Sequence, residues 1–125
     1  MKLLNIVILA ENYQELVGWY KNVLSLDTLL EEKGEYHYTE LGFEKKVILG
    51  ITPASEVKHT PAVPRNNSSL LQIEVSDIEA LFNDIRTNKG KILFGPSTEV
   101  KYGFRYGGFA DIEGNEVWVV EETIK

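Results

Sequence analysis

The feature that most constrains the fold is an internal repeat in the layout of the chain. An apolar run at Leu3–Leu9 is followed by a helix-type pattern and then by strand-type segments, and the same order begins again near Leu70. Asn5 and Leu70 are 65 residues apart, and Asn12 and Asp77 have the same spacing. With only two copies, this is a duplicated βαβββ module rather than a solenoid. Because neither half covers both faces of its small sheet alone, we expect the two to pack together, within one chain or across a dimer.

The first half opens with Leu3–Leu9, which is typical of a buried strand. Asn12 lies three residues before Glu15, a spacing that resembles a capping box at a helix start. The apolar face of that helix is predicted to consist of Leu16, Trp19, Tyr20, Val23 and Leu24. The period changes around Ser25, and strands are predicted at Thr28–Glu32, Tyr36–Gly42 and Lys46–Thr52, with turns at Lys33-Gly34 and Phe43-Glu44.

A proline-containing linker at residues 53–67 separates the halves, so the sequence predicts one domain over residues 1–125. Its modules cover about residues 1–52 and 68–125. Ser76 with Glu79 resembles a second capping box, and the helix that follows is expected to end at Gly90. Its apolar face is formed by Ile78, Leu81, Phe82 and Ile85. The predicted strands are Leu70–Val75, Lys91–Phe94 with Glu99–Lys101, Phe104–Ala110 and Glu116–Glu121.

Composition excludes several classes of function. The 125 residues contain no cysteine, which removes disulfides, thiolate nucleophiles and thiolate zinc sites. The formal net charge of −6 would repel a phosphate backbone, so nucleic acid is not expected as a partner. No apolar run approaches the roughly 20 residues that span a bilayer, and the N-terminus does not read as a signal peptide. We therefore expect a cytoplasmic protein without a membrane partner.

Three segments together resemble the vicinal-oxygen-chelate superfamily, the glyoxalase, bleomycin-resistance and extradiol dioxygenase fold. The segment 11–26, ENYQELVGWYKNVLSL, is similar to the first helix of the family, with its aromatic pair before a Val-Leu-x-Leu ending. The YGFR segment at 102–105 with FADIEGN at 109–115 resembles a closing signature of the family, and residues 76–79 resemble its second helix start. The resemblance implies an α+β fold in which two βαβββ modules with curved mixed sheets form a concave cavity. The Asp111–Asn115 turn also has a purely structural explanation, since Gly114 tolerates positive φ and Asn115 tolerates the left-handed region.

The resemblance also implies where metal ligands would lie, and those positions hold unsuitable residues. The two first-strand ligand positions fall on Asn5 and Leu70, the last-strand position falls on Trp118, and Val47–Ile51 contains no His, Asp, Glu or Gln. Leu and Trp do not coordinate a divalent ion, so no metal and no cofactor are predicted. The two histidines, His37 and His59, lack ligand-like spacing, although a relocated site using His37 with Glu35 or Glu40 stays open.

Strand alternation predicts which side chains line the cavity. Asn5, Gln72 and Trp118 fall on its side of their strands, and an indole there suits flat aromatic or cationic ligands. The opposite positions are expected to pack beneath the helices: Leu4, Ile6, Ile8, Leu71, Ile73, Val75, Val117 and Val119. The candidate ligand-binding residues are Asn5, Tyr36, Tyr38, Gln72, Tyr102, Phe104, Arg105 and Trp118, with Tyr106 as a further aromatic wall. Trp118 either forms a wall of the cavity or fills the space that a metal would occupy.

These features predict a metal-independent protein that binds a small aromatic or cationic molecule, similar to the bleomycin-resistance branch. Because ligands in that branch lie between two subunits, the resemblance implies a homodimer. Three alternatives stay open at this stage. One is a metal-dependent lyase or dioxygenase of the glyoxalase I or extradiol type, and another is a non-catalytic dimeric sensor. The third is a metal-free enzyme in which Glu74 with Gln72 acts as a general base; otherwise no catalytic residue is predicted.

Overall fold

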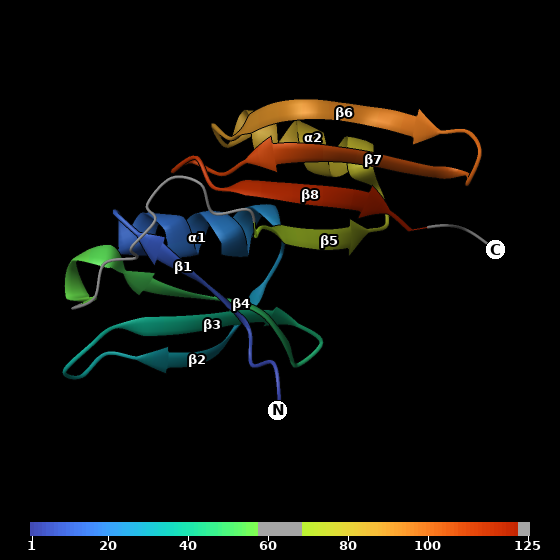
Figure 1. Ribbon diagram of the computed structural model, residues 1–125. Helices are drawn as coiled ribbons and strands as arrows, with labels where there is room; N and C mark the ends of the chain where they lie inside the picture. The colour runs from blue at the N-terminus through green and yellow to red at the C-terminus, as the bar shows by residue number, and fades with distance from the viewer. Residues whose placement is uncertain (58–68, 123–125) are drawn as a thin grey trace. The chain divides into compact units, whose positions relative to one another are not determined.

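A computed structural model describes residues 1–57 and 69–122 of the chain. It divides into two compact units, Met1–Asn67 and Ser68–Lys125. Each unit contains a four-stranded mixed sheet and one α-helix (Figure 1). The predicted α+β class and the two βαβββ modules are confirmed. No helix in the described ranges is long and apolar enough to cross a membrane.

Unit 1 has the strand order β1-β4-β3-β2. Strands β1 and β4 are parallel, and the other neighbouring pairs are antiparallel. Its elements are β1 (Ile6–Ala10), α1 (Tyr13–Val23), β2 (Asp27–Glu32), β3 (Tyr38–Phe43), β4 (Lys46–Pro53) and the short 3₁₀ helix η1 (Ala54–Glu56). The parallel pair follows from the crossover connection, because α1 lies in the path between β1 and the rest of the sheet.

Unit 2 repeats this topology with the order β5-β8-β7-β6. Strands β5 and β8 are parallel, and the remaining pairs are antiparallel. The elements are β5 (Leu71–Val75), α2 (Ile78–Thr87), β6 (Lys91–Glu99), β7 (Phe104–Ala110) and β8 (Glu116–Glu121). The bounds predicted for β7 and β8 are confirmed, and β5 begins one residue later than expected.

Each helix buries its apolar face against its own sheet. In α1 the buried residues are Leu16, Trp19, Tyr20 and Val23, and in α2 they are Ile78, Leu81, Phe82 and Ile85, as the 3.6-residue period predicts. Beneath α2, Val117 and Val119 are 1% and 0% exposed, which confirms these two predicted core positions. Because side chains alternate along a strand, Trp118 and Val120 lie on the opposite face of β8, away from α2.

Two predicted core residues near the N-terminus are exposed, so that prediction was wrong. Leu4 and Ile6 are 77% and 42% exposed. The predicted strand began at Leu3, whereas β1 begins at Ile6 and lies at the edge of its sheet, with β4 as its neighbour. Since α1 packs on β4, it covers the middle of the sheet rather than its edge strand.

Both predicted capping boxes differ from the observed helix starts. Asn12 occupies the N-cap position of α1, but its side chain makes no capping hydrogen bond. In α2 the cap is Asp77 rather than Ser76, and Asp77 Oδ1 accepts a hydrogen bond from the Ala80 backbone N–H at 3.0 Å. A carboxylate is the better partner there, because it also interacts favourably with the positive end of the helix dipole. At the other end, α2 stops at Thr87, three residues before the predicted Gly90.

The strand bounds and turns of unit 1 also shift slightly. Strand β3 begins at Tyr38 instead of Tyr36, which lies in the preceding loop. The β3–β4 turn uses Glu44 and Lys45 with φ of 51° and 66°, rather than Phe43-Glu44. Positive φ at both central residues is the geometry of a two-residue type I′ hairpin, and the chain adopts it here without glycine or asparagine.

Two further differences concern unit 2. Strand β6 is continuous from Lys91 to Glu99 where the sequence predicted a break, and its pairing is irregular between Phe94 and Ser97. Pro96 lies in this stretch, and a proline is tolerated because β6 is an edge strand. In the predicted turn after β7, Gly114 has φ of 91° as expected. Asn115 is not left-handed; it donates to the Asp111 carboxylate instead.

Candidate functional site

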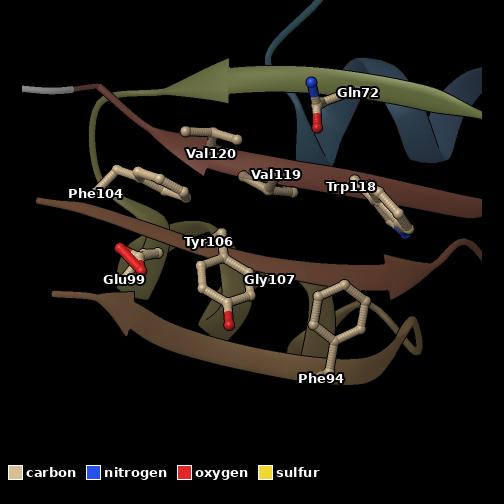
Figure 2. A pocket seen from close by; sticks show the side chains of 9 residues that line it. All are labelled: Gln72, Phe94, Glu99, Phe104, Tyr106, Gly107, Trp118, Val119 and Val120. Carbon is tan, nitrogen blue, oxygen red and sulfur yellow. The ribbon is translucent and has the colours of Figure 1, made fainter. Parts of the chain in front are cut away.

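The open face of the unit 2 sheet, opposite α2, carries a cavity of about 310 Å³. Four aromatic rings from three neighbouring strands surround it, and Figure 2 shows them spread over β6, β7 and β8. The lining residues are Gln72, Phe94, Glu99, Phe104, Tyr106, Gly107, Trp118, Val119 and Val120. The size is at the lower end of the range for small-molecule sites, and the lining is predominantly apolar as in such sites.

Sheet register explains why the rings gather here. Phe94 pairs with Gly108, and Gly108 pairs with Trp118 on its other side, so one glycine separates two aromatic side chains in a row across the sheet. A Cβ on Gly108 would lie 2.4 Å from the Phe94 ring. The absence of a side chain at Gly108 therefore lets the Phe94 ring lie across β7.

Trp118 is a wall of this cavity and not part of the core. It is 42% exposed, and its ring packs edge-to-face against Phe94 with centroids 6.2 Å apart and planes at 87°. Its indole Nε1–H donates to Glu116 Oε2 at 2.9 Å, which orients the ring. Of the two roles open from the sequence, the ligand-contacting wall fits this exposure, whereas a space-filling residue would be buried.

The charges around the cavity are negative. Glu99 lines it, and Glu116 lies against the indole, while no Lys, Arg or His is among the lining residues. Glu99 Oε2 accepts a hydrogen bond from the Tyr102 backbone N–H at 2.9 Å, which anchors the carboxylate beside the cavity. Aromatic faces combined with nearby carboxylates attract cations. The cavity therefore suits a flat, positively charged molecule better than an anion.

The corresponding open face of unit 1 carries a closed polar cluster, which we call the Asn5 cluster (Asn5, Tyr38 and Glu40). Asn5 Nδ2 donates to the Tyr38 hydroxyl at 2.8 Å and to Glu40 Oε2 at 3.3 Å, and the Tyr38 hydroxyl donates to Glu40 Oε2 at 2.7 Å. Burial, followed by the hydrogen bond to Glu40, raises the pKa of Tyr38. A Cβ on Gly50 would lie 2.7 Å from the Tyr38 hydroxyl oxygen, so the tyrosine covers that glycine.

The structure separates the eight predicted ligand-binding residues into groups. Gln72, Phe104 and Trp118 line the unit 2 cavity. Asn5 and Tyr38 belong to unit 1 and bond to each other. The other three do not line the unit 2 cavity: Tyr36 is 56% exposed, Tyr102 is 70% exposed, and Arg105 Nη2 pairs with Glu79 Oε1 of α2 at 2.7 Å.

Several residues that line the cavity were not predicted from the sequence. Phe94 and Glu99 contribute side chains to its wall. Tyr106, expected only as a further wall, does line the cavity. The signal that could have found Phe94 is an aromatic residue on one strand facing the Gly107-Gly108 pair on the next. Reading it requires the β6–β7 register, and the irregular pairing after Phe94 hides that register from the sequence.

The residues at the family's metal-ligand positions do not form a suitable donor set. The Asn5 amide is already bonded to Tyr38 and Glu40, while Leu70 and Trp118 offer no ligand atom for a divalent ion. No group of three His, Cys, Asp or Glu side chains within residues 1–57 and 69–122 is arranged to hold a metal. At the relocated site considered from the sequence, His37 bonds to Glu56, whereas Glu40 bonds within the Asn5 cluster. His59 lies outside the described residues.

The alternative general base, Glu74, is not among the residues that line the unit 2 cavity. It lies on β5, two residues after Gln72, and pairs in register with Val120 of β8. Gln72 itself pairs with Trp118 and does reach the cavity. The arrangement therefore brings the Gln72 amide to this cavity but not the Glu74 carboxylate that was considered as a general base.

This fold also occurs in known proteins. The family model for the glyoxalase/bleomycin resistance protein/dioxygenase superfamily matches residues 2–119. No curated protein sequence matches the chain. Among solved structures, a superfamily member from Sphaerobacter thermophilus DSM 20745 is 14% identical with a TM-score of 0.75, and the match covers 98% of both chains. TioX from Micromonospora sp. ML1 is also 14% identical, with a TM-score of 0.70, over 98% of this chain and all of that one.

Glyoxalase I from Zea mays gives a comparable structural match. It is 21% identical with a TM-score of 0.74, and the match covers 95% of this chain but 45% of that chain. At these identities the solved structures show the fold alone, whereas the family model spans both βαβββ units. With the duplicated topology and the open-face cavity now described, the match assigns the chain to the glyoxalase/bleomycin resistance protein/dioxygenase superfamily.

Proposed function

We propose that this chain is a metal-independent small-molecule-binding protein whose unit 2 cavity takes a flat aromatic cation. The observation that carries the proposal is the exposed ring of Trp118, held edge-to-face against Phe94, whose ring lies over Gly108. An open apolar cavity of about 310 Å³ with few polar groups suits binding by stacking and burial. The carboxylates of Glu99 and Glu116 favour a positive charge on the ligand.

Metal independence rests on the chemistry of the donor positions. Asn5 offers a neutral amide that is already bonded to two partners, Leu70 offers an aliphatic side chain, and Trp118 offers an indole. None of these groups replaces the His and carboxylate ligands of a divalent metal site. Binding should therefore survive chelator treatment. A lyase or dioxygenase that polarises vicinal oxygens would need a Lewis acid at these positions, and the residues present do not supply its ligands.

Two single-tryptophan variants test the proposal directly. Trp19 is 7% exposed in α1, so Trp118→Phe leaves a buried reporter in unit 1, whereas Trp19→Phe leaves the reporter in the cavity. Both proteins are treated with EDTA and titrated with N-methylquinolinium, with quinoline as the neutral ring and tetramethylammonium as the charge without a ring. We expect saturable quenching of Trp118 by N-methylquinolinium, weaker binding of quinoline, and none by tetramethylammonium.

The adjacent aromatic residues Phe104 and Tyr102 provide a matched control. Phe104 lines the cavity, while Tyr102 does not and is 70% exposed. Phe104→Leu should weaken binding, and Tyr102→Leu should leave it unchanged. Equal quenching of Trp19 and Trp118, or binding restored only when Ni²⁺, Zn²⁺, Fe²⁺ or Mn²⁺ is added back, would contradict the proposal.

The proposal includes a homodimer, supported by the apolar edge of unit 1. Val7 and Leu9 of β1 are 47% and 37% exposed, and Ile6 on the same edge strand is also exposed. An exposed apolar edge strand favours association unless it is covered. Sedimentation velocity should therefore give a dimer, and Val7→Lys should shift the protein toward a monomer. A wild-type monomer at all concentrations would sink this part of the proposal while leaving the ligand titration to be judged separately.

A further inference from the structure

A second cavity lies in unit 1 between α1 and the β2–β3 connection, away from the Asn5 cluster. Its volume is about 440 Å³, and its lining includes Tyr13, Gly18 and Lys21 of α1 together with Lys33, His37 and Thr39. Gly18 leaves it roomy, because a Cβ there would meet no atom within 4 Å. This cavity is independent of the unit 2 cavity, and nothing in the proposed function uses it.

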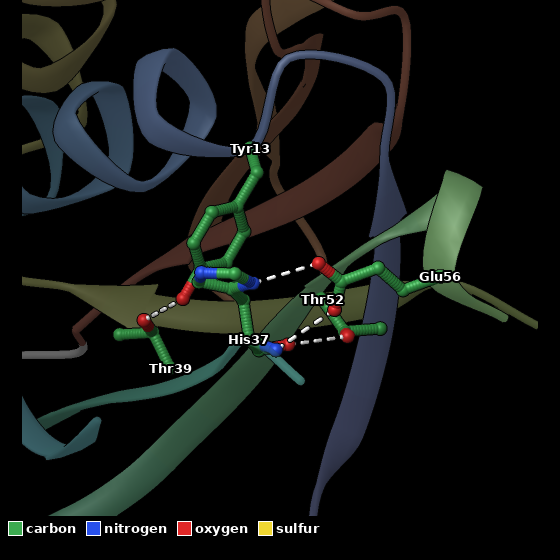
Figure 3. A network of polar contacts seen from close by, with 5 residues as sticks. All are labelled: Tyr13, His37, Thr39, Thr52 and Glu56. Atoms are coloured by element: carbon green, nitrogen blue, oxygen red, sulfur yellow. Dashed lines mark hydrogen bonds and ion pairs between the residues drawn. The ribbon is translucent and has the colours of Figure 1, made fainter. Parts of the chain in front are cut away.

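The histidine in this cavity is held by contacts on several sides. Glu56 Oε1 accepts a hydrogen bond from the His37 backbone N–H at 2.8 Å, and Glu56 Oε2 contacts His37 Nδ1 at 2.7 Å (Figure 3). Thr52 Oγ1 donates to the His37 carbonyl oxygen at 2.7 Å. Because an ionised carboxylate only accepts hydrogen bonds, Nδ1 carries a proton, and the ring presents Nε2 as its remaining polar atom. Within the described residues, Nε2 makes no hydrogen bond.

Hydroxyl groups and an aromatic ring complete this side of the cavity. The Tyr13 hydroxyl is hydrogen-bonded to Thr39 Oγ1, and Thr39 is 1% exposed. The Tyr13 ring lies edge-on to the His37 imidazole with centroids 6.0 Å apart, as Figure 3 shows. The imidazole is therefore oriented by Glu56 on one side and Tyr13 on another, so ligand binding would not have to order it first.

Two lysines supply positive charge to the same cavity. Lys33 already has a carboxylate partner, because its Nζ lies 3.7 Å from Glu31 Oε1. Lys21 makes no ion pair in the part of the chain that the structure describes. Glu31 and Glu56 are the carboxylates near the cavity, and both already have cationic or N–H partners. The unmatched cation is Lys21, and an imidazole with a free Nε2 is the second donor when it is protonated.

We propose that this unit 1 cavity is a binding site for a small aromatic carboxylate. The carboxylate pairs with Lys21 and accepts a hydrogen bond from His37 Nε2–H, and the ring of the ligand lies in the space beside Gly18 and Tyr13. Tyr13 from α1 and Glu56 from η1 contact His37, and Glu31 and Lys33 line the same cavity.

Benzoate and benzamide provide probes that match in shape but differ in charge. The ¹⁵N-labelled full chain is titrated with each, and with inorganic phosphate, while the amide signals of Gly18, Lys21 and His37 are followed. We expect saturable shifts with benzoate, no saturation with benzamide, and at least fivefold weaker binding of phosphate. Lys21→Gln should weaken benzoate binding roughly fivefold, as for loss of one partly exposed ion pair.

Two further variants complete the test. Gly18→Leu places a side chain in the empty space and should abolish benzoate binding, and the helix is retained because Leu is a better helix former than Gly. Lys46→Gln, at the start of β4 and outside the cavity lining, should leave binding unchanged. Equal binding of benzamide and benzoate, stronger binding of phosphate than benzoate, or an unaltered affinity in Lys21→Gln would each overturn the proposal.

Discussion

The two units share one topology but use the open faces of their sheets differently. In both, an aromatic side chain lies over a strand glycine: Tyr38 over Gly50 in unit 1 and Phe94 over Gly108 in unit 2. In unit 1 the tyrosine hydroxyl is tied to Asn5 and Glu40, which closes the face with hydrogen bonds. In unit 2 the ring has no hydroxyl, and the space beside it remains as a cavity.

This difference shows that the duplicated fold supplies positions, while the side chains decide what each position does. The cavity of unit 2 is on the open face, between aromatic side chains, whereas the cavity of unit 1 is between its helix and its sheet. The open faces of the two units also differ in polarity. The open face of unit 1 carries the hydrogen-bonded Asn5 cluster, whereas exposed aromatic surface lies around Trp118 in unit 2. The following substitutions test this contrast, in order of decreasing effect.

Alanine at each of the two covered glycines should have the largest effect. A Cβ would lie 2.4 Å from the Phe94 ring at Gly108, and 2.7 Å from the Tyr38 hydroxyl oxygen at Gly50. We expect either variant to lower the free energy of unfolding by about 1–3 kcal/mol, because overpacking displaces the ring. Only Gly108→Ala should also lose N-methylquinolinium binding. Urea denaturation and fluorescence titration of the same samples measure both effects. Loss of binding in Gly50→Ala would contradict the difference between the open faces of the two units.

Removing the Trp118 ring should cost ligand affinity with little effect on stability. Because the side chain is 42% exposed, Trp118→Ala leaves no buried cavity. Loss of the aromatic contact should weaken N-methylquinolinium binding by about 0.5–1.5 kcal/mol, in addition to the effect of burying less apolar surface. Asn5→Ala, at another altered metal-ligand position, should bind normally. Calorimetric titration of the two variants distinguishes them, and an equal loss in Asn5→Ala would show that the open faces act together.

The Asn5 cluster should be visible in the titration of Tyr38. Burial and the hydrogen bond to Glu40 raise its pKa above the usual value of about 10. A raised folded-state pKa stabilises the protein below the unfolded value, and this contribution is lost as pH rises through the folded pKa. Glu40→Gln removes the nearby carboxylate charge, so the Tyr38 pKa should fall while staying raised by burial. Ring ¹³C shifts between pH 8 and pH 12 measure this, and an unchanged pKa in Glu40→Gln would rule out the cluster in solution.

The smallest effect is expected at Glu56. Hydrogen bonds from the His37 backbone and then from its side chain lower the Glu56 pKa. A lowered folded-state pKa gives a contribution that is present above the unfolded value and is lost as pH falls through the folded one. His37→Ala keeps the backbone donor and removes the ring, so the Glu56 pKa should rise part of the way to its usual value. Carboxyl ¹³C titration measures the shift. A wild-type Glu56 pKa at its usual value would contradict the His37–Glu56 contact.

Much of the fold could be predicted from the sequence because it depends on periodic burial. The buried faces of α1 and α2 and the bounds of β7 and β8 follow from apolar spacing, which secondary structure imposes on any such chain. The edge strand β1 was harder. Its apolar residues indicate a core strand, but burial of Leu4 and Ile6 depends on which strand α1 covers, and that is set by tertiary packing.

The candidate site could be predicted only in part. Trp118, Gln72 and Phe104 could be placed by alternation along regular strands. Alternation failed for Phe94 because the irregular β6 pairing hides its partner Gly108. Arg105 is adjacent to Phe104 and so points toward the other face, where it pairs with Glu79. The His37–Glu56 contact joins residues 19 apart through η1, which no periodic pattern signals.

Intermolecular NOEs between N-methylquinolinium and chelator-treated protein would locate the bound cation. If the unit 2 cavity binds this cation without a metal, ligand ring protons give NOEs to the Trp118 indole and the Phe94 ring with no metal ion added. Contacts confined to other residues, or no complex until a divalent ion is supplied, would contradict it.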